Sequence, residues 1–566
     1  MSFFDDASLV FLPSGQAGKD GKAYSMKPTN GDGDFTFSRG SNLTATRVDS
    51  NGLIEKGREN LLLQSNQFDT TWTTNEASVT SGQSGYDGSS DAWLLEADSD
   101  GNGRRVQQSQ TQGGVATLSV YAKAGTTDWL RIEFGGAASL VYFDLTNGVL
   151  GSETNAIGKI ESVGNGWYRC SAVNTSGSTP STMRYHLASD NNNIAVLTGD
   201  NIYIQDAQLE IGLTSTEYIE SGASTGLAGI LEDSPRFDYS GGASCPSLLL
   251  EPSRTNLIGY SEYMAQSELS SYGTDVTHNA TQSPSGKNSA ALVYEESSNS
   301  QHYVLKGVTT SSSTTYTQSA FVKKKDSGIY ASLRTNGVGG NSYIIFDFDT
   351  ATIVDEGSDI ISSGVVDYSN GWYRIHMTYT LATISFIAGI TNSTTNPIPS
   401  YLGTGKGYYL WGAQVEQGSY PTSYIPNHSG GSVTREADDS TLSGIINGDA
   451  AFTFMIESGI QDYGSSVPKY FDAGALGYIN HNTSNILRYR FGGSNYVQSI
   501  SGLDSFKFLL RYDRSEIKVY FNGSLEHTIS ASLSGSIGLS LLGGLNKQVL
   551  LFPTDLPLNQ CITLTS

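Results

Sequence analysis

Two stretches of the chain, roughly two hundred residues apart, repeat the five residues Asn-Gly-Trp-Tyr-Arg. In each copy the tryptophan stands two residues before the arginine, so on a β-strand both side chains lie on one face. The pairs are Trp167 with Arg169 and Trp372 with Arg374. An exposed indole can stack on a sugar ring while the guanidinium hydrogen-bonds its hydroxyl groups, which makes these four residues candidates for carbohydrate binding. Under a covering loop, the arginine can instead stack on the indole as a cation–π pair of the scaffold.

A second candidate site is the segment Asp98–Gly103, where Asp98, Asp100 and Asn102 place side-chain oxygens at alternate positions before a glycine. This pattern matches the opening of a calcium loop, in which alternate oxygens converge on the ion and the glycine permits a sharp turn. The twelfth position is Ser109 rather than the bidentate glutamate, and no helical pattern flanks the loop. We predict a plain acidic turn and no cofactor, with a structural calcium ion at this loop as the alternative.

Carboxylates in repeated contexts are the candidates for catalysis. Asp144 and Asp347 share one context, and Glu210 and Glu416 share another. A glycosidase needs two carboxylates at a set distance across one cleft. The members of each pair belong to different copies of a repeat, so neither pair forms a dyad within one domain, and carboxylates that cap turns are more common. No G-x-S-x-G, H-E-x-x-H or P-loop pattern argues for catalysis, and we predict no enzyme.

The elements that position these residues form an internal repeat. RENLLLQS from Arg58 corresponds to RTNLIGYS from Arg254 at an offset of 196 residues, NGWYR follows at 205, and AQLEIGLTSTEYI corresponds to AQVEQGSYPTSYI at 206. The motifs keep their order, and small loop insertions explain the rising offset. The same folding unit is therefore present twice, and NGWYR belongs to its scaffold.

The pattern of apolar residues predicts an all-β chain of tandem β-sandwich (jelly-roll) domains. ATLSVYAKA, SLVYFDL and NIYIQDAQLEI cluster or alternate β-branched and aromatic residues between turn residues, and no sustained 3.6-residue stripe occurs. Asn522-Gly523, between two apolar strands, predicts a two-residue hairpin in a third sandwich. The predicted parts are an N-terminal attachment or connector segment (1–57), sandwich repeat 1 (58–222), a connector (223–253), sandwich repeat 2 (254–428) and a C-terminal sandwich (429–566).

Composition limits the partners. The net charge is −22 and the sequence pI about 4.6, so the surface repels phosphate backbones and anionic membranes, and we expect no nucleic-acid partner. The only cysteines, Cys170, Cys245 and Cys561, suggest neither a disulfide framework nor a zinc cluster, as suits a reducing cytoplasm. We also expect no signal peptide and no membrane insertion, because no apolar run approaches the roughly twenty residues that span a bilayer.

Two stretches with a connector followed by a sandwich resemble a known group of proteins. They are PRFDYSGGASCPSLLLEPSRTNLIGYSEYM from Pro235 and FTFSRGSNLTATRVDSNGLIEKGRENLLLQSNQF from Phe35. With the paired NGWYR elements, they are similar to bacteriophage virion proteins (tail fibres, head fibres and tail-tip proteins) that carry tandem carbohydrate-binding-module-like sandwiches. KVYFNGSL and LLFPTDLPLNQCITLTS near the C-terminus resemble the laminin-G or concanavalin-like sandwiches that often accompany them.

The resemblance implies jelly-roll folds, sugar binding and a place on the virion, reached by assembly in the host cytoplasm and release by lysis. We predict a non-enzymatic virion structural protein for host attachment. Its expected partners are other virion proteins and a host-surface glycan. We also expect a homo-oligomer, and the resemblance suggests a trimer. The alternative is a purely structural decoration, collar or tail-adaptor protein. A depolymerising tailspike would need a long parallel β-helix with a short repeat, and the sequence shows no such period.

Overall fold

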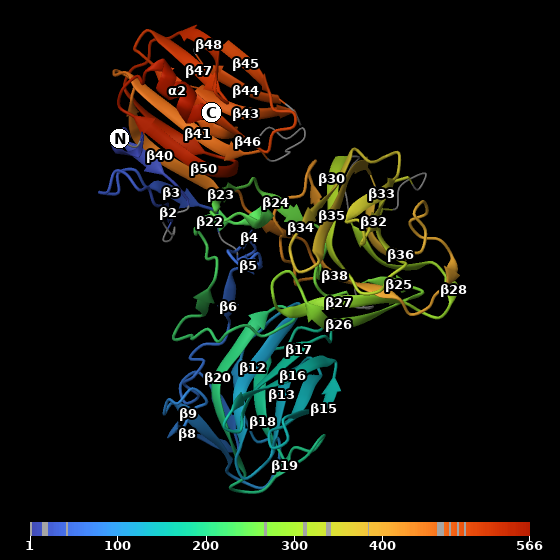
Figure 1. The fold of residues 1–566 in the computed structure, drawn as a ribbon. Helices are drawn as coiled ribbons and strands as arrows, with labels where there is room; N and C mark the ends of the chain where they lie inside the picture. The colour runs from blue at the N-terminus through green and yellow to red at the C-terminus, as the bar shows by residue number, and fades with distance from the viewer. Residues whose placement is uncertain are drawn as a thin grey trace.

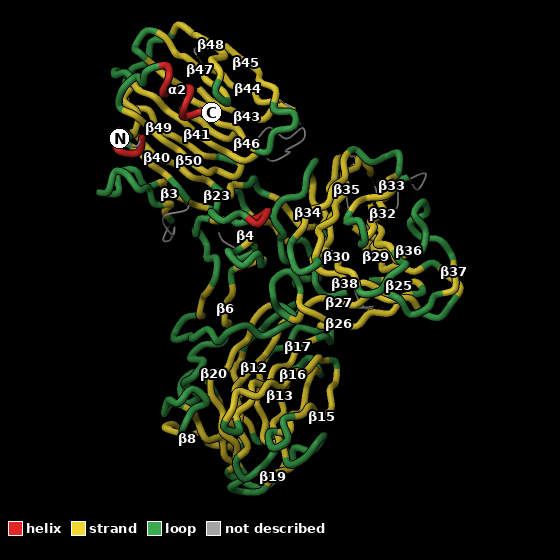
Figure 2. The backbone as a smooth tube through the Cα atoms, in the orientation of Figure 1, coloured by secondary structure: helices red, strands yellow, loops and turns green. Residues whose placement is uncertain are grey.

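The computed structural model describes residues 3–13, 21–40, 43–264, 269–308, 314–335, 341–382, 384–460, 469–474, 477–483, 486–491 and 494–566. Three β-sandwiches form three lobes around a central junction (Figure 1), and strands make up most of each lobe (Figure 2). The α-helices of the described residues are short, α1 (Phe3–Asp6) and α2 (Leu558–Thr565). None of them is long and apolar enough to cross a membrane. The predicted all-β fold class is confirmed.

Repeat 1 is a sandwich of two six-stranded antiparallel sheets, which we call the NGWYR sheet and the second sheet. The NGWYR sheet runs β16 (Ala156–Gly164), β17 (Trp167–Asn174), β12 (Ala116–Ala124), β20 (Asn201–Ile211), β9 (Ala92–Ala97), β8 (Ala77–Gln83). The second sheet runs β15 (Val149–Thr154), β14 (Ser139–Asp144), β13 (Trp129–Gly135), β18 (Thr182–Ala188), β11 (Arg105–Ser109), β7 (Thr73–Asn75). Leu118 of the NGWYR sheet and Ile132 of the second sheet belong to the single core between them.

Repeat 2 has the same topology, strand for strand. Its NGWYR sheet runs β34 (Ser362–Asp367), β35 (Trp372–Leu381), β30 (Thr314–Lys324), β38 (Gly407–Gln417), β27 (Asn288–Glu295), β26 (Thr274–Gln282). Its second sheet runs β33 (Thr352–Glu356), β32 (Tyr343–Asp347), β31 (Tyr330–Arg334), β36 (Ile384–Thr391), β29 (His302–Val308), β25 (Ser270–Tyr272). A minor pair also recurs, β10 (Gly101–Asn102) with β19 (Ala195–Val196) and β28 (Asn299–Ser300) with β37 (Tyr401–Leu402). The internal repeat is confirmed.

The third sandwich consists of two eight-stranded sheets. One runs β22 (Arg236–Asp238), β23 (Ser247–Leu250), β50 (Gly544–Phe552), β41 (Phe452–Gly459), β46 (Ser505–Tyr512), β47 (Glu516–Phe521), β48 (Ser524–Ser530), with β1 (Leu9–Phe11) also paired to β50. The other runs β2 (Lys22–Ala23), β3 (Phe35–Ser38), β40 (Asp439–Asn447), β49 (Ser536–Leu541), β42 (Lys469–Asp472), β43 (Gly477–Thr483), β44 (Ile486–Phe491), β45 (Ser494–Ser499). The hairpin predicted at Asn522-Gly523 joins β47 to β48, and both residues have positive φ.

The strands β1, β2 and β3 of the N-terminal segment belong to the third sandwich, although the sequence predicts a separate attachment or connector segment at residues 1–57. Leu9 pairs with Leu551, Phe37 pairs with Ser440, and Leu9 lies in the sandwich core. The strands β22 and β23, expected in a free connector at 223–253, complete the same sandwich. Strands of two to four residues do not reveal from sequence which distant strand they join, because backbone pairing carries little side-chain information. Figure 1 shows the N-terminal strands (blue) against the C-terminal lobe (orange and red).

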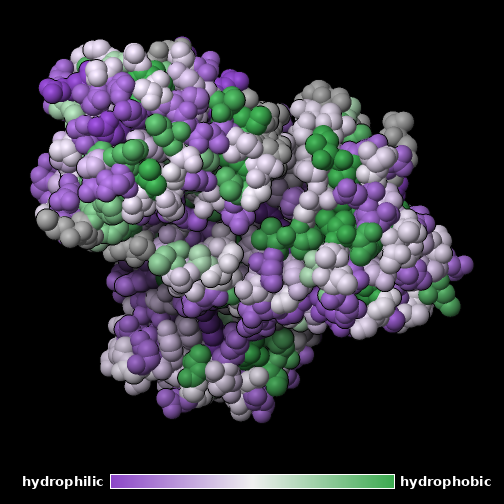
Figure 3. All heavy atoms as spheres, turned by 45° about the horizontal axis from the view of Figure 1, so that its top comes forward, coloured by the Kyte–Doolittle hydropathy of each residue, from purple (hydrophilic) through white to green (hydrophobic). Residues whose placement is uncertain are grey.

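Three short ladders connect the lobes: β4 (Thr46–Val48) with β5 (Ile54–Lys56), β6 (Arg58–Asn60) with β21 (Gly226–Ala228), and β24 (Arg254–Asn256) with β39 (Val433–Arg435). Repeat 1 contacts repeat 2 through apolar residues that include Val115 and Tyr263, and the Val115 N–H donates to the carbonyl of His428 at 3.0 Å. Figure 3 shows hydrophobic side chains in several patches on the face that it views, the most extended of them across the middle of the right-hand lobe.

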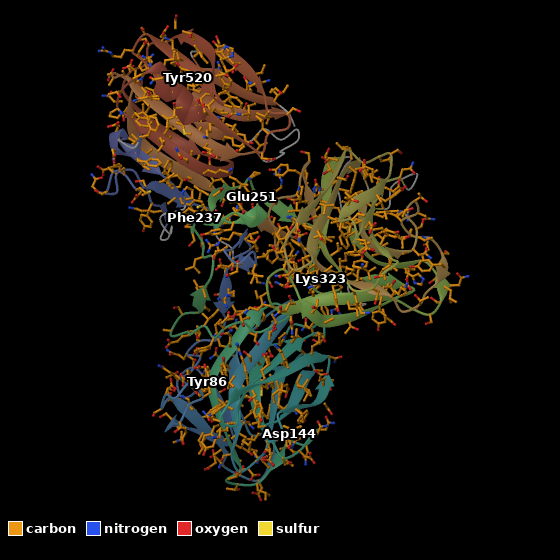
Figure 4. All side chains as sticks on the ribbon, viewed as in Figure 1. Tyr86, Asp144, Phe237, Glu251, Lys323 and Tyr520 are labelled. Atoms are coloured by element: carbon orange, nitrogen blue, oxygen red, sulfur yellow. The ribbon has the colours of Figure 1, made fainter. Side chains whose placement is uncertain are left out.

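A buried group of five charged residues, which we call the ion cluster, holds the junction together. Its members are Arg39, Arg236, Glu251, Arg435 and Asp438, whose side chains are at most 3% exposed. The Glu251 carboxylate is 2.8 Å from Arg236 and 2.9 Å from Arg435, while Asp438 contacts Arg39 at 3.3 Å and also contacts Arg236. Glu251 lies between the C-terminal lobe and repeat 2 (Figure 4). The ion cluster thus joins segments that are far apart in the sequence.

Candidate functional site

The two NGWYR tryptophans are buried. Trp167 and Trp372 each have 2% of their surface exposed. Tyr86, from the loop between β8 and β9, packs edge-on against Trp167, and Trp372 donates its indole N–H to the carbonyl of Gln282 at 3.0 Å. An indole with so little exposed surface offers no ring face to a sugar, so the geometry favours the scaffold interpretation at both positions.

The NGWYR arginines stack on rings of the neighbouring strand. The guanidinium carbon of Arg169 lies 5.3 Å from the ring centre of Tyr121, and that of Arg374 lies 5.3 Å from the ring centre of Phe321. Arg374 also donates to the carbonyl of Thr422 at 2.6 Å. The expected stacking on the indole of the same motif is thus replaced by stacking across strands, because directly opposite side chains are closer than residues two apart on one strand.

The repeated glutamates cap equivalent turns. Glu210 accepts a hydrogen bond from the backbone N–H of Thr216 at 2.8 Å, and Glu416 accepts one from the backbone N–H of Thr422 at 2.9 Å. The hydroxyl group of each threonine donates to the same carboxylate. Both glutamates are buried, and they bond the same backbone position in both copies. They therefore hold the scaffold.

The repeated aspartates also bond to turns that follow their strands. Asp144 accepts from the backbone N–H of Asn147 at 2.9 Å and from its side-chain amide at 2.8 Å. Asp347 accepts from the backbone N–H of Asp349 at 2.8 Å. Asp144 lies toward the end of repeat 1 that is remote from the other sandwiches (Figure 4). Neither aspartate is bonded to the repeated glutamate of its own domain. These contacts therefore give no acid–base dyad.

The guanidinium group of Arg104 bonds to the backbone of the loop for which calcium was the alternative to a plain acidic turn. It donates to the backbone carbonyls of Asn102 at 2.6 Å and Asp100 at 2.5 Å. The Asp100 carboxylate accepts from the backbone N–H and the hydroxyl of Thr198, both at 2.8 Å, and these bonds lower its pKa. Asp98 is exposed. The described residues contain no group of three His, Cys, Asp or Glu side chains that could hold a metal ion.

The outward side of the second sheet of repeat 1 carries a cluster of charged side chains, which we call the arginine face. Two rows of residues in register cross β11, β18, β13 and β14. The first row is Arg105, His186, Arg131 and Tyr142, and the second row is Gln107, Arg184, Glu133 and Leu140. Side chains alternate along each strand, so Val106, Ile132 and Tyr185, which lie between these positions, point into the core. Arg105 and Arg131 are separated by two strand spacings, about 10 Å between backbones.

Positive charge is in excess on the arginine face. Glu133 is its one carboxylate, 2.8 Å from Arg184, 3.0 Å from His186 and in contact with Arg131. Burial, together with the three neighbouring arginines, lowers the pKa of His186 well below its usual range, so this ring is neutral. Burial and the repulsion of Arg184 and Arg131 also lower the pKa of Arg105. Three cations therefore face one anion, in a chain whose net charge is −22.

Repeat 2 lacks the arginine face although it has the same sheet. The equivalent rows are Tyr303, Gly389, Ser332, Ile345 and Leu305, Ile387, Arg334, Tyr343. Ser332 and Ile345 are fully buried, and Ser332 donates to the carbonyl of Pro397, which lies in a loop against this side of the sheet. The sandwich therefore folds without arginines in the first row, and the fold does not require them in repeat 1.

The sequence alone does not reveal the arginine face. A signal was present, since WLRIEFG and TMRYHLA alternate apolar with charged or aromatic residues and so predict one polar face on each strand. Arg131 and Arg184 are distant in the sequence, however, and only the order of strands in the sheet brings them together.

A cavity of about 430 Å³ lies where the N-terminal segment meets both repeats. On its wall, Lys56 Nζ is 2.9 Å from His428 Nε2, which is 3.7 Å from Glu262. The Tyr424 hydroxyl donates to Glu262 at 3.2 Å. Burial lowers the pKa of His428 well below its usual range and raises that of Glu262. The volume suits a small ligand, but these polar groups bond to one another, so the cavity belongs to the junction between domains.

No family model matches this chain, and no curated protein matches it. Similar solved structures include the CBM40 module of the Ruminococcus gnavus IT-sialidase bound to α2,3-sialyllactose (14% identity, 21% of this chain, 83% of the module, TM-score 0.18). Another is mouse laminin α1 LG4–5 (9% identity, 50% of this chain, 94% of that chain, TM-score 0.14). A third is Trypanosoma rangeli sialidase (11% identity, 93% of this chain, 98% of that chain, TM-score 0.19). At these identities and TM-scores, we draw no argument about activity or ligand from the likenesses.

Proposed function

We propose that this chain is a non-enzymatic structural protein of a bacteriophage virion, displayed on the particle as a tail or head fibre, and that it binds carbohydrate on the host surface. The motifs of its connectors and sandwiches, which resemble those of virion proteins, support the first part. The arginine face supports the second part, because guanidinium groups offer several donors in a planar fork. Trp129 stands two residues before Arg131 on the same side of β13 and adds an aromatic ring to this surface.

The observation that carries the binding proposal is the difference between the two repeats. Both copies keep the residues that hold the sandwich, such as the NGWYR motif and the glutamates that cap turns. Only repeat 1 has the arginine face, so these side chains are not part of the shared scaffold. A cluster that the fold does not need, on the outside of a sheet, is the best candidate for contact with another molecule.

Display in several copies would strengthen weak sites. A homo-oligomer on a particle presents the same face repeatedly, and linked binding can raise the overall affinity about 10²–10⁴-fold without new contacts. The contacts between the two repeats support this arrangement, because Val115 packs with Tyr263 and bonds to His428 and so holds repeat 1, with its arginine face, against repeat 2.

Adsorption of the purified full-length protein to cells of the phage's host tests the binding proposal. We expect saturable binding that periodate oxidation of the cell surface abolishes. The double variant Arg131→Gln/Arg184→Gln should lose this binding, whereas Arg334→Gln, the arginine on the equivalent face of repeat 2, should keep it. Adsorption by the folded double variant at the wild-type level would place the binding surface elsewhere.

The alternative function is purely structural, as a decoration, collar or tail-adaptor protein. The ion cluster favours it as well, because a buried ionic connection between the third sandwich and repeat 2 suits a part that holds other virion proteins in place. Mass spectrometry of gradient-purified particles tests the location that both functions share. Particles that contain the protein, combined with a folded wild type that does not adsorb to cells, would favour the structural alternative.

A further inference from the structure

We propose that the arginine face binds a saccharide through a negatively charged substituent, a carboxylate or a phosphate ester, held between Arg105, Arg131 and Arg184. This inference rests on the proposed carbohydrate binding and names the class of ligand. Carboxylate and phosphate share the chemistry that matters here, because both accept two parallel hydrogen bonds from one guanidinium group.

The first argument is charge. Glu133 bonds to Arg184 and Arg131. Among the described residues no acidic side chain contacts Arg105, which donates to Gln107 at 2.8 Å and to the carbonyl of Gly103 at 2.9 Å. Like charges held close together on a half-buried surface repel each other. An anion placed among them would remove this repulsion, whereas a neutral sugar would leave it in place.

The second argument is hydrogen bonding. The Nε atoms of Arg131 and Arg184 are buried and have no hydrogen-bond partner in the described part of the protein. Arg334, on the equivalent face of repeat 2, has a single unpaired Nε atom of this kind. Buried polar groups are nearly always paired in folded proteins, so two guanidinium groups with unpaired nitrogens on one surface favour a ligand that offers acceptor atoms.

The third argument is accessibility. The side chain of Arg184 is 26% exposed and that of Arg131 is 12% exposed, so both are covered in part and still reach solvent. Partial burial matters because a charge-assisted hydrogen bond is stronger where water is partly excluded. The face is therefore better suited to anion binding than the same arginines would be at a fully exposed position.

The scaffold explanation predicts a different pattern. If the charged rows only stabilised the sheet, the equivalent sheet of repeat 2 would need a comparable network. Its rows contain a single charged residue, Arg334, yet the strand order and pairing are the same. The network in repeat 1 therefore exceeds what the sheet needs.

Calorimetric titration of the full-length protein tests the ligand class. The probes are tetragalacturonate, a neutral galactose tetramer and a phosphorylated mannose tetramer, each also measured at high ionic strength. We expect one or both anionic probes to bind, with weaker binding in high salt because screening reduces the attraction, and no binding of the neutral probe. The anionic probe that binds with the higher affinity identifies the substituent as carboxylate or phosphate.

Three variants sharpen the test. Arg184→Gln should weaken binding of the anionic probe about 10- to 100-fold, as expected for the loss of a hydrogen bond to a charged group. Glu133→Gln should tighten it, because the internal carboxylate that competes for Arg131 and Arg184 is removed. Arg334→Gln, on the equivalent face of repeat 2, should have no effect. Thermal melting of each variant confirms that it is folded, and the tighter binding of Glu133→Gln cannot arise from a damaged fold.

The outcomes separate this inference from the function on which it rests. Adsorption to cells that depends on the arginines, without binding of either anionic probe, would overturn the ligand class and leave carbohydrate binding in place. Adsorption that is unchanged in Arg131→Gln/Arg184→Gln would overturn both. Weaker binding in Glu133→Gln would contradict the competition between Glu133 and the ligand. Self-association of the protein that Arg184→Gln abolishes would reassign the face to contacts between copies of this chain.

Discussion

Replacing Asp438 with asparagine should destabilise the junction strongly. The Asp438 side chain is fully buried, contacts Arg39 and Arg236, and accepts the backbone N–H of Glu251 at 2.9 Å. The substituted side chain would keep the shape of the aspartate but lose its charge. The cluster would then contain three arginines and a single carboxylate, that of Glu251, in a site from which water is excluded.

The magnitude follows from the burial of these charges. Removing one partner of a buried ion pair costs about 3–5 kcal/mol, because the remaining charge stays buried without compensation. A domain has about 5–15 kcal/mol of stability in total. For a sandwich of this size, the loss corresponds to a fall in Tm of about 6–20 °C. The pKa of Glu251 points the same way: burial disfavours its charge, but Arg435 and Arg236 lower the pKa to about 2.

Differential scanning calorimetry of the full-length protein measures this effect, and Asp439→Asn provides the matched control. Asp439 is the next residue along the chain and is exposed, so its neutralisation removes the same charge without touching the cluster. We expect the transition of the third sandwich to shift in Asp438→Asn and to stay in place in Asp439→Asn. Equal transition temperatures in the two variants would refute the stabilising role of the ion cluster.

The other predictions concern single domains. The fragment 429–566 should not fold alone, because β1–β3, β22 and β23 are missing from its sheets. The fragment 58–222, which contains both sheets of repeat 1, should melt cooperatively. A cooperative transition in the fragment 429–566 would contradict the strand pairing of the third sandwich. Trp372→Ala should cost about 3–5 kcal/mol in chemical denaturation, and normal stability would indicate an exposed indole. EDTA should leave the Tm unchanged, because Arg104 occupies the loop at 98–103; a lower Tm would indicate a bound metal ion. Asp206→Asn should raise stability at pH 8 but not at pH 3.5. Burial raises the pKa of Asp206 to about 7, so stability is lost as pH rises from about 4, the pKa of an unfolded aspartate, through 7. An equal change in stability at pH 8 and pH 3.5 would refute the raised pKa of Asp206.

Much of the scaffold could be predicted from local patterns. Asn522-Gly523 predicted its hairpin because only a few residue types adopt positive φ at two successive positions without strain. Side chains alternate strictly along a strand, so Ile375 and Met377 lie on the face opposite Trp372 and Arg374, and both belong to the core. The offset between the two copies predicted the shared topology, because similar sequences of this length fold alike.

The candidate site could not be predicted in the same way. Arg105, Arg131 and Arg184 occur on three different strands, and each could be recognised from sequence only as a polar position on its own strand. Likewise, nothing local to Trp167 shows that Tyr86 covers it. Long-range neighbours depend on which strands pair and which loops fold over a sheet, and both are decided by the packing of the whole domain.

The sequence by itself determined the periodicity, the duplication and the turns of this protein, because each depends on residues that are close together in the chain. The tertiary structure alone decided that the first strands complete the last sandwich, that the NGWYR tryptophans are covered, and that one of two equivalent sheets gathers three arginines, two of them paired with one glutamate. The physical reason is that strand pairing uses the backbone, which is nearly the same for every residue. The chemistry of a sheet surface arises only when that pairing sets distant side chains next to one another.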